Sequence, residues 1–279
     1  MLVDLHMHST FSDGRLTPTE LVQQAIEQHL GVIALTDHDS WNGYAEAQAA
    51  AERQESLTGQ RLRVLVGVEL STQHEGRAVH VLGYHVNRSC QALLDKMNEM
   101  RHKREHRLEE MLAKCKTQGM ELTVEACDPR NRAVGRPHVA KAMVEKGYVK
   151  TVQEAFDKYL HRGGPCYVEQ PKLSPREAVE LIHKAGGLAV LAHPSEIEDS
   201  TVPELLVSRI PFDGIEIWHP SAIEHNDFAK WQALAQKYQL CLSGGSDFHG
   251  ILDRFPAKLG IWKVKYVDVK DVIEFRREQ

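Results

Sequence analysis

Paired cysteines are missing from this sequence. Its five cysteines are dispersed, and none belongs to a Cys-x-x-Cys pair: Cys90, Cys115, Cys127, Cys166 and Cys241. An odd, scattered set is typical of reduced thiols and argues against a disulfide scaffold or a cysteine-rich zinc site. We therefore expect the thiols to be free.

Long apolar runs and an excess of positive charge are also absent. No run approaches the roughly 20 apolar residues of a membrane helix, and the first residues lack the basic and apolar regions of a secretory signal. We expect a cytoplasmic protein without membrane contact. Lys and Arg number 34 against 39 Asp and Glu, a net charge of −5, so a nucleotide or nucleic-acid substrate would need local positive charge.

Histidine, by contrast, is abundant, with 16 residues, and it is combined with carboxylates in three clusters. His6 and His8 follow an apolar run, and because strand side chains alternate in direction, both can face one metal ion. The three clusters are Asp4-Leu5-His6-Met7-His8 with Asp13, Thr36-Asp37-His38-Asp39, and Ser246-Asp247-Phe248-His249. A metal centre is the first hypothesis that they suggest.

Short apolar runs alternate with helical patterns along most of the chain. Two helices are announced by capping boxes that begin at Thr17 and Ser174, and the second should stop at Gly186-Gly187. This alternation predicts an α/β, barrel-like fold. The predicted strands are 2–5, 32–36, 64–68, 79–84, 188–192, 214–218, 240–243 and 259–264.

The alternation breaks between residues 86 and 167. This segment is rich in helical patterns and contains the basic run from Arg101 to Arg107. We predict one domain over residues 1–279, interrupted by a helical insertion (a lid) over residues 86–167.

Candidate metal ligands lie at the predicted carboxyl ends of the strands, where α/β barrels build their active sites. Imidazole and carboxylate ligands without thiolate suit Mn²⁺, Fe²⁺ or Zn²⁺, and there are more of them than one ion needs. Taken singly, His193 could be a loop residue and Asp247 a helix cap. To dismiss a metal site, however, a separate explanation of this kind would have to hold for every candidate. The candidates are His6, His8, Asp37, His38, Glu69, His193, His219, Asp247 and His249.

These motifs resemble the PHP (polymerase and histidinol phosphatase) family. The resemblance rests on residues 4–9, Ser12-Asp13-Gly14, Thr36-Asp37-His38-Asp39, Gly67-Val68-Glu69, Ala192-His193-Pro194 and residues 245–249. It implies a distorted (β/α)7 barrel with an inserted helical subdomain and a centre of two or three divalent metals, with Mn²⁺ favoured over Zn²⁺ or Fe²⁺.

The resemblance also implies a ligand set. The first metal would take His6, His8, Glu69 and Asp247; Glu69 would bridge to a second, completed by His80 and His193; Asp13, His38 and His249 would hold the third. His80 is preferred to His74 and His85 by its strand pattern. The candidate catalytic residues are Asp37, His193 and Asp247. The resemblance assigns no metal to Asp37, whose place beside His38 suits a carboxylate that orients a ligand or relays a proton, the alternative being that it merely orders its loop.

Basic residues of the insertion suggest a phosphate site. Along residues 93–115 the apolar stripe also includes Arg104, with Arg101 on a neighbouring face, and a guanidinium on an inward face suits a phosphate. Arg136, after Gly135 and before a helix, could also bind an anion. The alternative is a solvated helix with pairs such as Arg101–Glu105, which fits Lys103, His106 and Arg107 better than Arg104.

Within the PHP family, the insertion resembles that of bacterial nucleoside 3′,5′-bisphosphate phosphatases, some of which are 5′→3′ exoribonucleases. Residues 136–138, 156–160, 163–164 and 167–168 carry the likeness, whereas Ser195-Glu196 departs from the usual Gly-Arg. The resemblance implies that a metal-bridging hydroxide cleaves the 3′-phosphoester of a 5′-phosphorylated nucleotide or short RNA, with no obligatory protein partner. The alternatives are a histidinol-phosphate phosphatase, which needs no nucleotide-sized lid, and a non-catalytic metal-binding module, which would have lost ligands.

Overall fold

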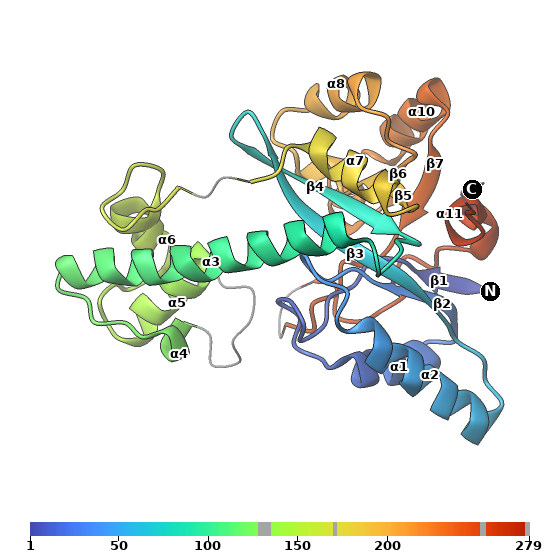
Figure 1. Ribbon diagram of the computed structural model, residues 1–279, viewed down its shortest axis with the longest axis horizontal. Coiled ribbons are helices and arrows are strands. Elements are labelled where there is room, and N and C mark those ends of the chain that lie inside the picture. The colour runs from blue at the N-terminus through green and yellow to red at the C-terminus, as the bar shows by residue number, and fades with distance from the viewer. Residues whose placement is uncertain (128–134, 170–171, 252–254, 277–279) are drawn as a thin grey trace. The chain divides into compact units, whose positions relative to one another are not determined.

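The computed structural model describes residues 1–127, 135–169, 172–251 and 255–276, and its contacts divide the chain into two compact units. The first unit spans residues 1–95 and 172–279, and the second spans residues 96–171 (Figure 1). The predicted insertion, 86–167, covers most of the second unit. That the whole chain works as one interrupted domain stays a prediction.

The first unit contains a seven-stranded sheet in the order β1 to β7. Neighbouring strands are parallel except that β4 is antiparallel to both β3 and β5. The strands are β1 (Leu2–Asp4), β2 (Leu30–Leu35), β3 (Arg63–His74), β4 (Arg77–Tyr84), β5 (Leu188–Leu191), β6 (Gly214–Trp218) and β7 (Cys241–Gly244).

The predicted α/β class is confirmed, but the described sheet is not a closed barrel. No strand ladder joins β1 to β7 among the described residues; just beyond β1, the Leu5 amide donates to the Gly244 carbonyl at 3.2 Å. Closure into a (β/α)7 barrel is therefore not shown.

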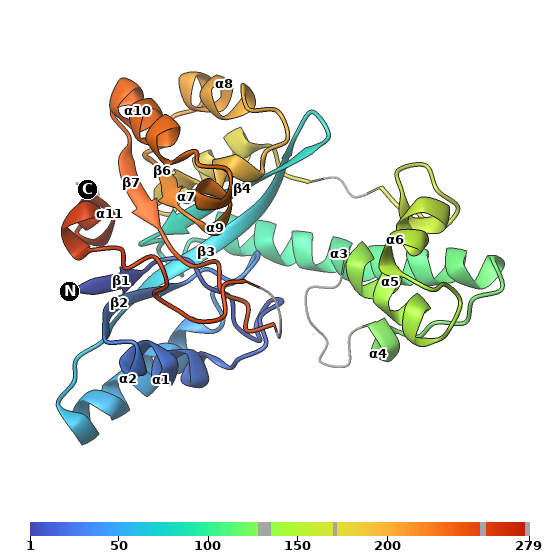
Figure 2. The ribbon, with the colours of Figure 1, turned by 180° about the vertical axis from the view of Figure 1, so that it is seen from behind.

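Helices flank this sheet on both sides (Figures 1 and 2). Helices α1 and α2 pack near β2 and β3, α7 packs against β3 to β5, and α9 and α10 pack against β6. Both predicted capping boxes are present, at Thr17–Glu20 and Ser174–Glu177. The helices are α1 (Pro18–Glu27), α2 (Tyr44–Thr58), α7 (Pro175–Lys184), α8 (Val202–Arg209), α9 (Pro220–Glu224), α10 (Phe228–Tyr238) and α11 (Lys270–Ile273), with short 3₁₀ turns at Pro194–Glu196 and Tyr266–Asp268.

Strands of the first unit are buried on both faces, as their continuous apolar runs predicted. In β2, Val32 and Ala34 belong to one core cluster, whereas Ile33 and Leu35 belong to another. Alternating side chains thus fill two cores, which leaves the strand ends as the place for polar groups.

Two strand predictions are wrong. Residues 259–264 form turns because Gly260 and Lys263 adopt left-handed backbone, with φ of 65° and 50°, and only an isolated bridge joins Lys265 to Leu2. Strand β3 also does not end before Glu69: it continues to His74 because it pairs with β4 in a long hairpin. Glu69 and His80 therefore lie within strands and not at their ends.

The second unit is helical and has its own core. Helix α3 (Gln91–Thr117) begins in the first unit and continues into the second, which also contains α4 (Val124–Cys127), α5 (Arg136–Glu145), α6 (Val152–Ala155) and a π-helical turn at Phe156–Leu160. The predicted apolar stripe is buried: Leu93, Met97, Met100, Leu108, Met111 and Cys115. All five cysteines are free, as predicted.

No helix in the described part of the chain is both long and apolar enough to span a membrane.

Candidate metal centre

Backbone hydrogen bonds bring the three histidine–carboxylate clusters together in the first unit. The Thr36 amide donates to the Met7 carbonyl at 3.0 Å, the His8 amide to Phe248 at 2.9 Å, and the Asp247 amide to His6 at 2.9 Å. Segments more than 200 residues apart thus meet beyond the ends of β1, β2 and β7. His6 and His8 are both completely buried on the same side, as their spacing predicted.

Glu69 lies at the middle of the resulting cluster. Its Oε2 atom is 3.1 Å from His8 Nε2, 3.2 Å from His38 Nδ1 and 3.4 Å from His6 Nε2. Its Oε1 atom is 2.8 Å from His80 Nδ1 and 2.9 Å from His193 Nε2. The two oxygens of one carboxylate thus face two different sets of imidazoles, as a bridging ligand would.

The first predicted ligand set is gathered in a single group. Candidate ligand atoms of His6, His8, Glu69 and Asp247 lie within 4.8 Å of one another. Asp247 Oδ1 is 3.1 Å from His8 Nε2 and 3.3 Å from His6 Nε2. Ligands bonded to an ion at about 2.1 Å must themselves lie about 3.0–3.4 Å apart, so these separations fit a coordination shell.

The predicted second and third ligand sets are also gathered, but their groups differ slightly from the prediction. Asp13, His38 and His249 form a group that also includes His8, and a further group joins Glu69 and His80 to His38. His193, predicted to complete the second set, contacts Glu69 but does not belong to that group. The roles of all nine predicted ligands stay predictions.

Several atoms of the cluster suit a cation. Asp13 Oδ1, Glu69 Oε2, His38 Nδ1 and His80 Nδ1 are buried and lie 2.8–3.5 Å from other candidate ligands, and buried charged groups of this kind are commonly stabilised by a bound cation. Burial raises the pKa of the Glu69 carboxyl, but nearby imidazoles outweigh it and hold that pKa well below its usual value. The side chains therefore fit divalent ions.

The pKa values of three imidazoles in the cluster are also shifted. Burial lowers the pKa of His8 and His193, but hydrogen bonds to Glu69, and for His8 also to Asp247, raise it to about 10 and about 9 respectively. Burial dominates for His38 and lowers its pKa to about 4. Protons and metal ions must compete for His8 and His193.

Two residues of the cluster have unusual backbone conformations. His193 and Asp247 have φ angles of 23° and 51°, a region that costs residues other than glycine about 1–3 kcal/mol. The His193 amide is held there by a 2.9 Å hydrogen bond to Glu216 Oε2. Such strain is common at functional sites and here aims both side chains at the cluster.

Asp37 is surrounded by donors from its own neighbourhood. Its carboxylate accepts hydrogen bonds from the Ser9 amide at 2.7 Å, the Ser9 hydroxyl at 2.7 Å and the Ser12 hydroxyl at 2.6 Å. It belongs to none of the potential metal groups among the described residues. The geometry favours the loop-ordering alternative, and a catalytic role stays a prediction.

Glu216 is a residue of the cluster that was not predicted from the sequence. This completely buried residue of β6 accepts at Oε1 from His6 Nδ1 at 2.9 Å and at Oε2 from the His193 amide. A carboxylate on the far nitrogen of a ligating imidazole fixes its tautomer and its direction. The signal was a lone glutamate between Ile215 and Ile217 in an otherwise apolar strand.

The predicted phosphate-binding arginines belong to the second unit. Arg101 is exposed and donates to Asn98 at 3.0 Å. Arg104 is half-buried. Arg136 is half-buried, donates to the Leu160 carbonyl at 3.3 Å and lies over the rings of Phe156 and Tyr167, at 5.7 and 5.5 Å.

Arg107 lies near Arg104 and Arg136. The sequence had favoured a solvated position for this residue. It is half-buried and donates to the Val168 carbonyl at 2.9 Å. Burial lowers its pKa, and the positive charges of Arg136 and Arg104 lower it further. Arg136 and Arg104 thus both lie near enough to act on the charge of Arg107, while Tyr167 and the Glu169 carboxylate act in the opposite direction.

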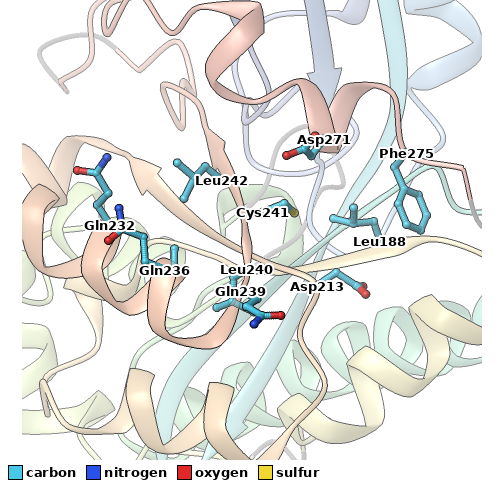
Figure 3. Close-up of a pocket in the computed structure, with 11 residues that line it drawn as sticks. Leu188, Asp213, Gln232, Gln236, Gln239, Leu240, Cys241, Leu242, Asp271 and Phe275 are labelled. Atoms are coloured by element: carbon cyan, nitrogen blue, oxygen red, sulfur yellow. The ribbon is translucent and has the colours of Figure 1, made fainter.

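A pocket of about 530 Å³ in the first unit lies away from the metal ligands. It is lined by Leu188 and Cys241, the first residues of β5 and β7, and by side chains of α10 and α11 (Figure 3). None of the predicted site residues lines it. The candidate metal ligands and the pocket therefore lie at opposite ends of these strands.

The α/β fold, the cluster of potential metal ligands and the relatives reported below together define the class of this protein as a hydrolase. A model of the PHP domain matches residues 4–169, and the chain belongs to this family.

Characterised relatives cover most of the chain. A 3′,5′-nucleoside bisphosphate phosphatase of Chromobacterium violaceum is 35% identical over 88% of this chain and 87% of its own length. The 5′-3′ exoribonuclease Rnm of Escherichia coli is 34% identical over 89% of this chain and 85% of its own. A solved structure from Chromobacterium violaceum, described as an amidohydrolase with bound sulfate, is similar with a TM-score of 0.80 and 31% identity, and covers 100% of this chain and 99% of that one.

Proposed function

We propose that this protein hydrolyses the 3′-phosphoester of nucleotides that carry a 5′-phosphate. A nucleoside 3′,5′-bisphosphate would give a 5′-mononucleotide and phosphate. A 5′-phosphorylated RNA would give a mononucleotide and a shortened chain. By their names, the two relatives above act on a 3′,5′-nucleoside bisphosphate and on RNA from its 5′ end. In both proposed reactions the bond that is broken is a 3′-phosphoester.

The observation that carries the proposal is the position of Glu69. Because its two oxygens face two sets of imidazoles, adjacent ions would share it. Divalent ions bound there would supply a hydroxide nucleophile and neutralise charge on the phosphoryl oxygens. We favour Mn²⁺, with Zn²⁺ or Fe²⁺ as alternatives, because the ligands are imidazoles and carboxylates without thiolate.

The chain's own residues would prepare the reaction. The sets built on His6, Asp13 and His80 would hold the ions, with His193 and Asp247 as ligands beside the reacting phosphorus. Glu216 would orient His6 and the His193 backbone through its two hydrogen bonds. Asp37 would fix the loop that contains Ser9 and Ser12, so that the ligands keep their positions.

The arginines would recognise the phosphate that is not cleaved. Arg104 and Arg136, proposed from the sequence, are joined by Arg107, and planar guanidiniums bind phosphate through paired hydrogen bonds. Arg101 is the weakest member of this proposal because it is exposed and donates to Asn98. A histidinol-phosphate phosphatase would have no use for such a group.

Turnover by the metal-loaded protein tests the function. The substrates are adenosine 3′,5′-bisphosphate, adenosine 3′-phosphate, histidinol phosphate, and one short RNA with either a 5′-phosphate or a 5′-hydroxyl. We expect 5′-AMP from the bisphosphate and the 5′-mononucleotide of the first residue from the 5′-phosphorylated RNA, with a Glu69→Ala protein as the blank for contaminating phosphatases. Hydrolysis of histidinol phosphate alone would overturn the proposal. The cytoplasmic location stays a sequence-based prediction.

A further inference from the structure

His219 faces the candidate metal centre but differs from the other histidines there. It follows β6, is only 1% exposed and precedes helix α9. Its Nε2 atom is buried, and among the described residues it has no hydrogen bond of ordinary length, only a long one to Asp247. Asp247 Oδ2 lies 3.6 Å from that nitrogen, so the atom is directed at the cluster.

The tautomer of His219 is fixed by Ser221. The Ser221 backbone amide donates to His219 Nδ1 at 3.2 Å, and the Ser221 hydroxyl lies 2.7 Å from the same nitrogen. A backbone N–H can only donate, so Nδ1 must accept, and a neutral imidazole then carries its hydrogen on Nε2. The nitrogen directed at the cluster is therefore an N–H group.

An Nε2–H group is unsuited to bind a metal, although His219 lies within reach of potential ligands. Groups of His219 with Glu216 and His6, or with Asp247 and Glu196, have metal-like spacing. Binding through Nε2 would require the hydrogen to move to Nδ1, where it would face the Ser221 amide hydrogen. The metal ligand Asp247 presents Oδ1 to His6 and His8 and its other oxygen to His219.

We propose that His219 is a hydrogen-bond donor to the phosphoryl group undergoing hydrolysis and that it is not a metal ligand. The proposal rests on the proposed function for the identity of that group as a phosphoester. A preorganised donor directed at a phosphoryl oxygen stabilises the charge that develops in the transition state. Burial makes such a contact stronger than it would be in water.

Two substitutions separate this role from a ligand role. Glutamine can place an amide N–H close to the position of Nε2, whereas asparagine reaches only as far as Nδ1. We compare His219→Gln and His219→Asn with His225→Asn, which changes an exposed histidine just after α9. The measurements are metal content per chain, affinity for inorganic phosphate by calorimetry on the metal-loaded protein, and kcat and KM.

We expect full metal content in all three variants. His219→Asn should lower kcat on the order of 10²-fold, by analogy with the loss of one donor from an oxyanion site, and should weaken phosphate binding. His219→Gln should restore much of both properties, and His225→Asn should match the wild type. Loss of metal from both His219 variants would identify a ligand and overturn the proposal. Equal loss of kcat in both with unchanged phosphate affinity would also overturn it, because His219 would then act only through Asp247.

The wild-type protein gives a test that does not depend on the folding of variants. In a crystal of metal-loaded wild type soaked with inorganic phosphate, Nε2 should lie within hydrogen-bonding distance of a phosphate oxygen. A metal bonded to Nε2 would overturn the proposal. If wild type hydrolyses none of the phosphoesters, the proposed function fails, while metal content and phosphate affinity still decide the role of His219.

Discussion

Glu216 Oε1 lies 2.9 Å from His6 Nδ1, and both residues are completely inaccessible to solvent. The other oxygen of the same carboxylate accepts from the His193 amide. One residue of β6 therefore fixes two predicted metal ligands, His6 and His193, that are far apart in the sequence. We therefore expect the candidate metal centre to depend on this support as well as on its predicted ligands.

Glu216→Gln should weaken metal binding about 10- to 100-fold, the usual effect of losing a carboxylate behind a ligating histidine. The amide can still contact His6 but removes the negative charge that favours the correct tautomer. The measurement is a chelator-competition titration. Glu224→Gln, an exposed change on α9, is the control, and equal affinities in the two variants would show that Glu216 does not support the ligands.

Glu69 should matter for more than one ion. Because its two oxygens face different imidazole sets, Glu69→Ala should remove more than one metal per chain. Asp13→Ala should remove about one, since Asp13 belongs to a single potential group. Elemental analysis of the purified proteins gives the counts. A Glu69 variant that loses no more metal than the Asp13 variant would argue against bridging.

The stability of the metal-free protein should fall as the pH rises above neutrality. His8 and His193 have pKa values of about 10 and about 9, above the unfolded value of roughly 6.5. The stability that they contribute is fully present below about pH 6.5 and is lost as the pH rises through 9 to 10. His38 has a pKa of about 4, below the unfolded value, so it destabilises the folded state only in acid. This destabilisation is absent above about pH 6.5.

Acid should also destabilise the metal-free protein, because the depressed pKa values of Glu69 and Asp247 make their contribution vanish as those carboxylates take up protons. The free energy of unfolding of the metal-free protein should therefore be highest near pH 6.5. Urea unfolding of chelator-treated protein at pH 5, 6.5, 8 and 9.5 measures this curve. A metal-free protein that is most stable at pH 9.5 would contradict the expectation.

Several candidate ligands could be proposed from the sequence because they form local patterns, although their binding of metal stays a prediction. His6 and His8, or Asp247 and His249, stand two residues apart, and each pair follows an apolar run. Glu216 could not be found in this way, since its partner His6 is 210 residues distant and a single glutamate in a strand has several explanations. The turn at residues 259–264 was missed because the positive φ of Lys263 leaves no mark in an apolar pattern.

Arg107 shows a different limit of prediction from sequence, which concerns the burial of long side chains. The helical pattern correctly predicted which residues of α3 are buried, from Leu93 to Cys115. Whether an arginine beside that stripe is solvated depends on what packs over it, and the Val168 carbonyl that accepts from Arg107 is 61 residues away. Periodicity describes one helix, whereas burial of a long side chain depends on its neighbours in space.

Asp37→Asn should lower stability and leave metal content intact. An amide in place of this carboxylate would turn an NH₂ group toward one of its present donors, the Ser9 amide or the Ser9 and Ser12 hydroxyls. An unsatisfied buried polar group costs about 1–3 kcal/mol. Urea unfolding and elemental analysis are the measurements. Unchanged stability with a large loss of kcat would instead favour the catalytic role that the sequence suggested.

Removal of the clustered arginines should weaken recognition of the 5′-phosphate. Arg104→Ala, Arg107→Ala and Arg136→Ala should each raise KM for adenosine 3′,5′-bisphosphate about 10-fold, because a hydrogen bond to a charged group contributes about 1.5–3 kcal/mol. Lys103→Ala removes the same charge from an exposed residue of α3 that pairs with Glu99, and it should leave KM nearly unchanged. Adenosine 3′-phosphate, which lacks the 5′-phosphate, should be hydrolysed only slowly by the wild type, and all four variants should hydrolyse it at the same slow rate. If the arginine variants lose activity equally on both substrates, the arginines support the fold of the second unit and do not bind the 5′-phosphate.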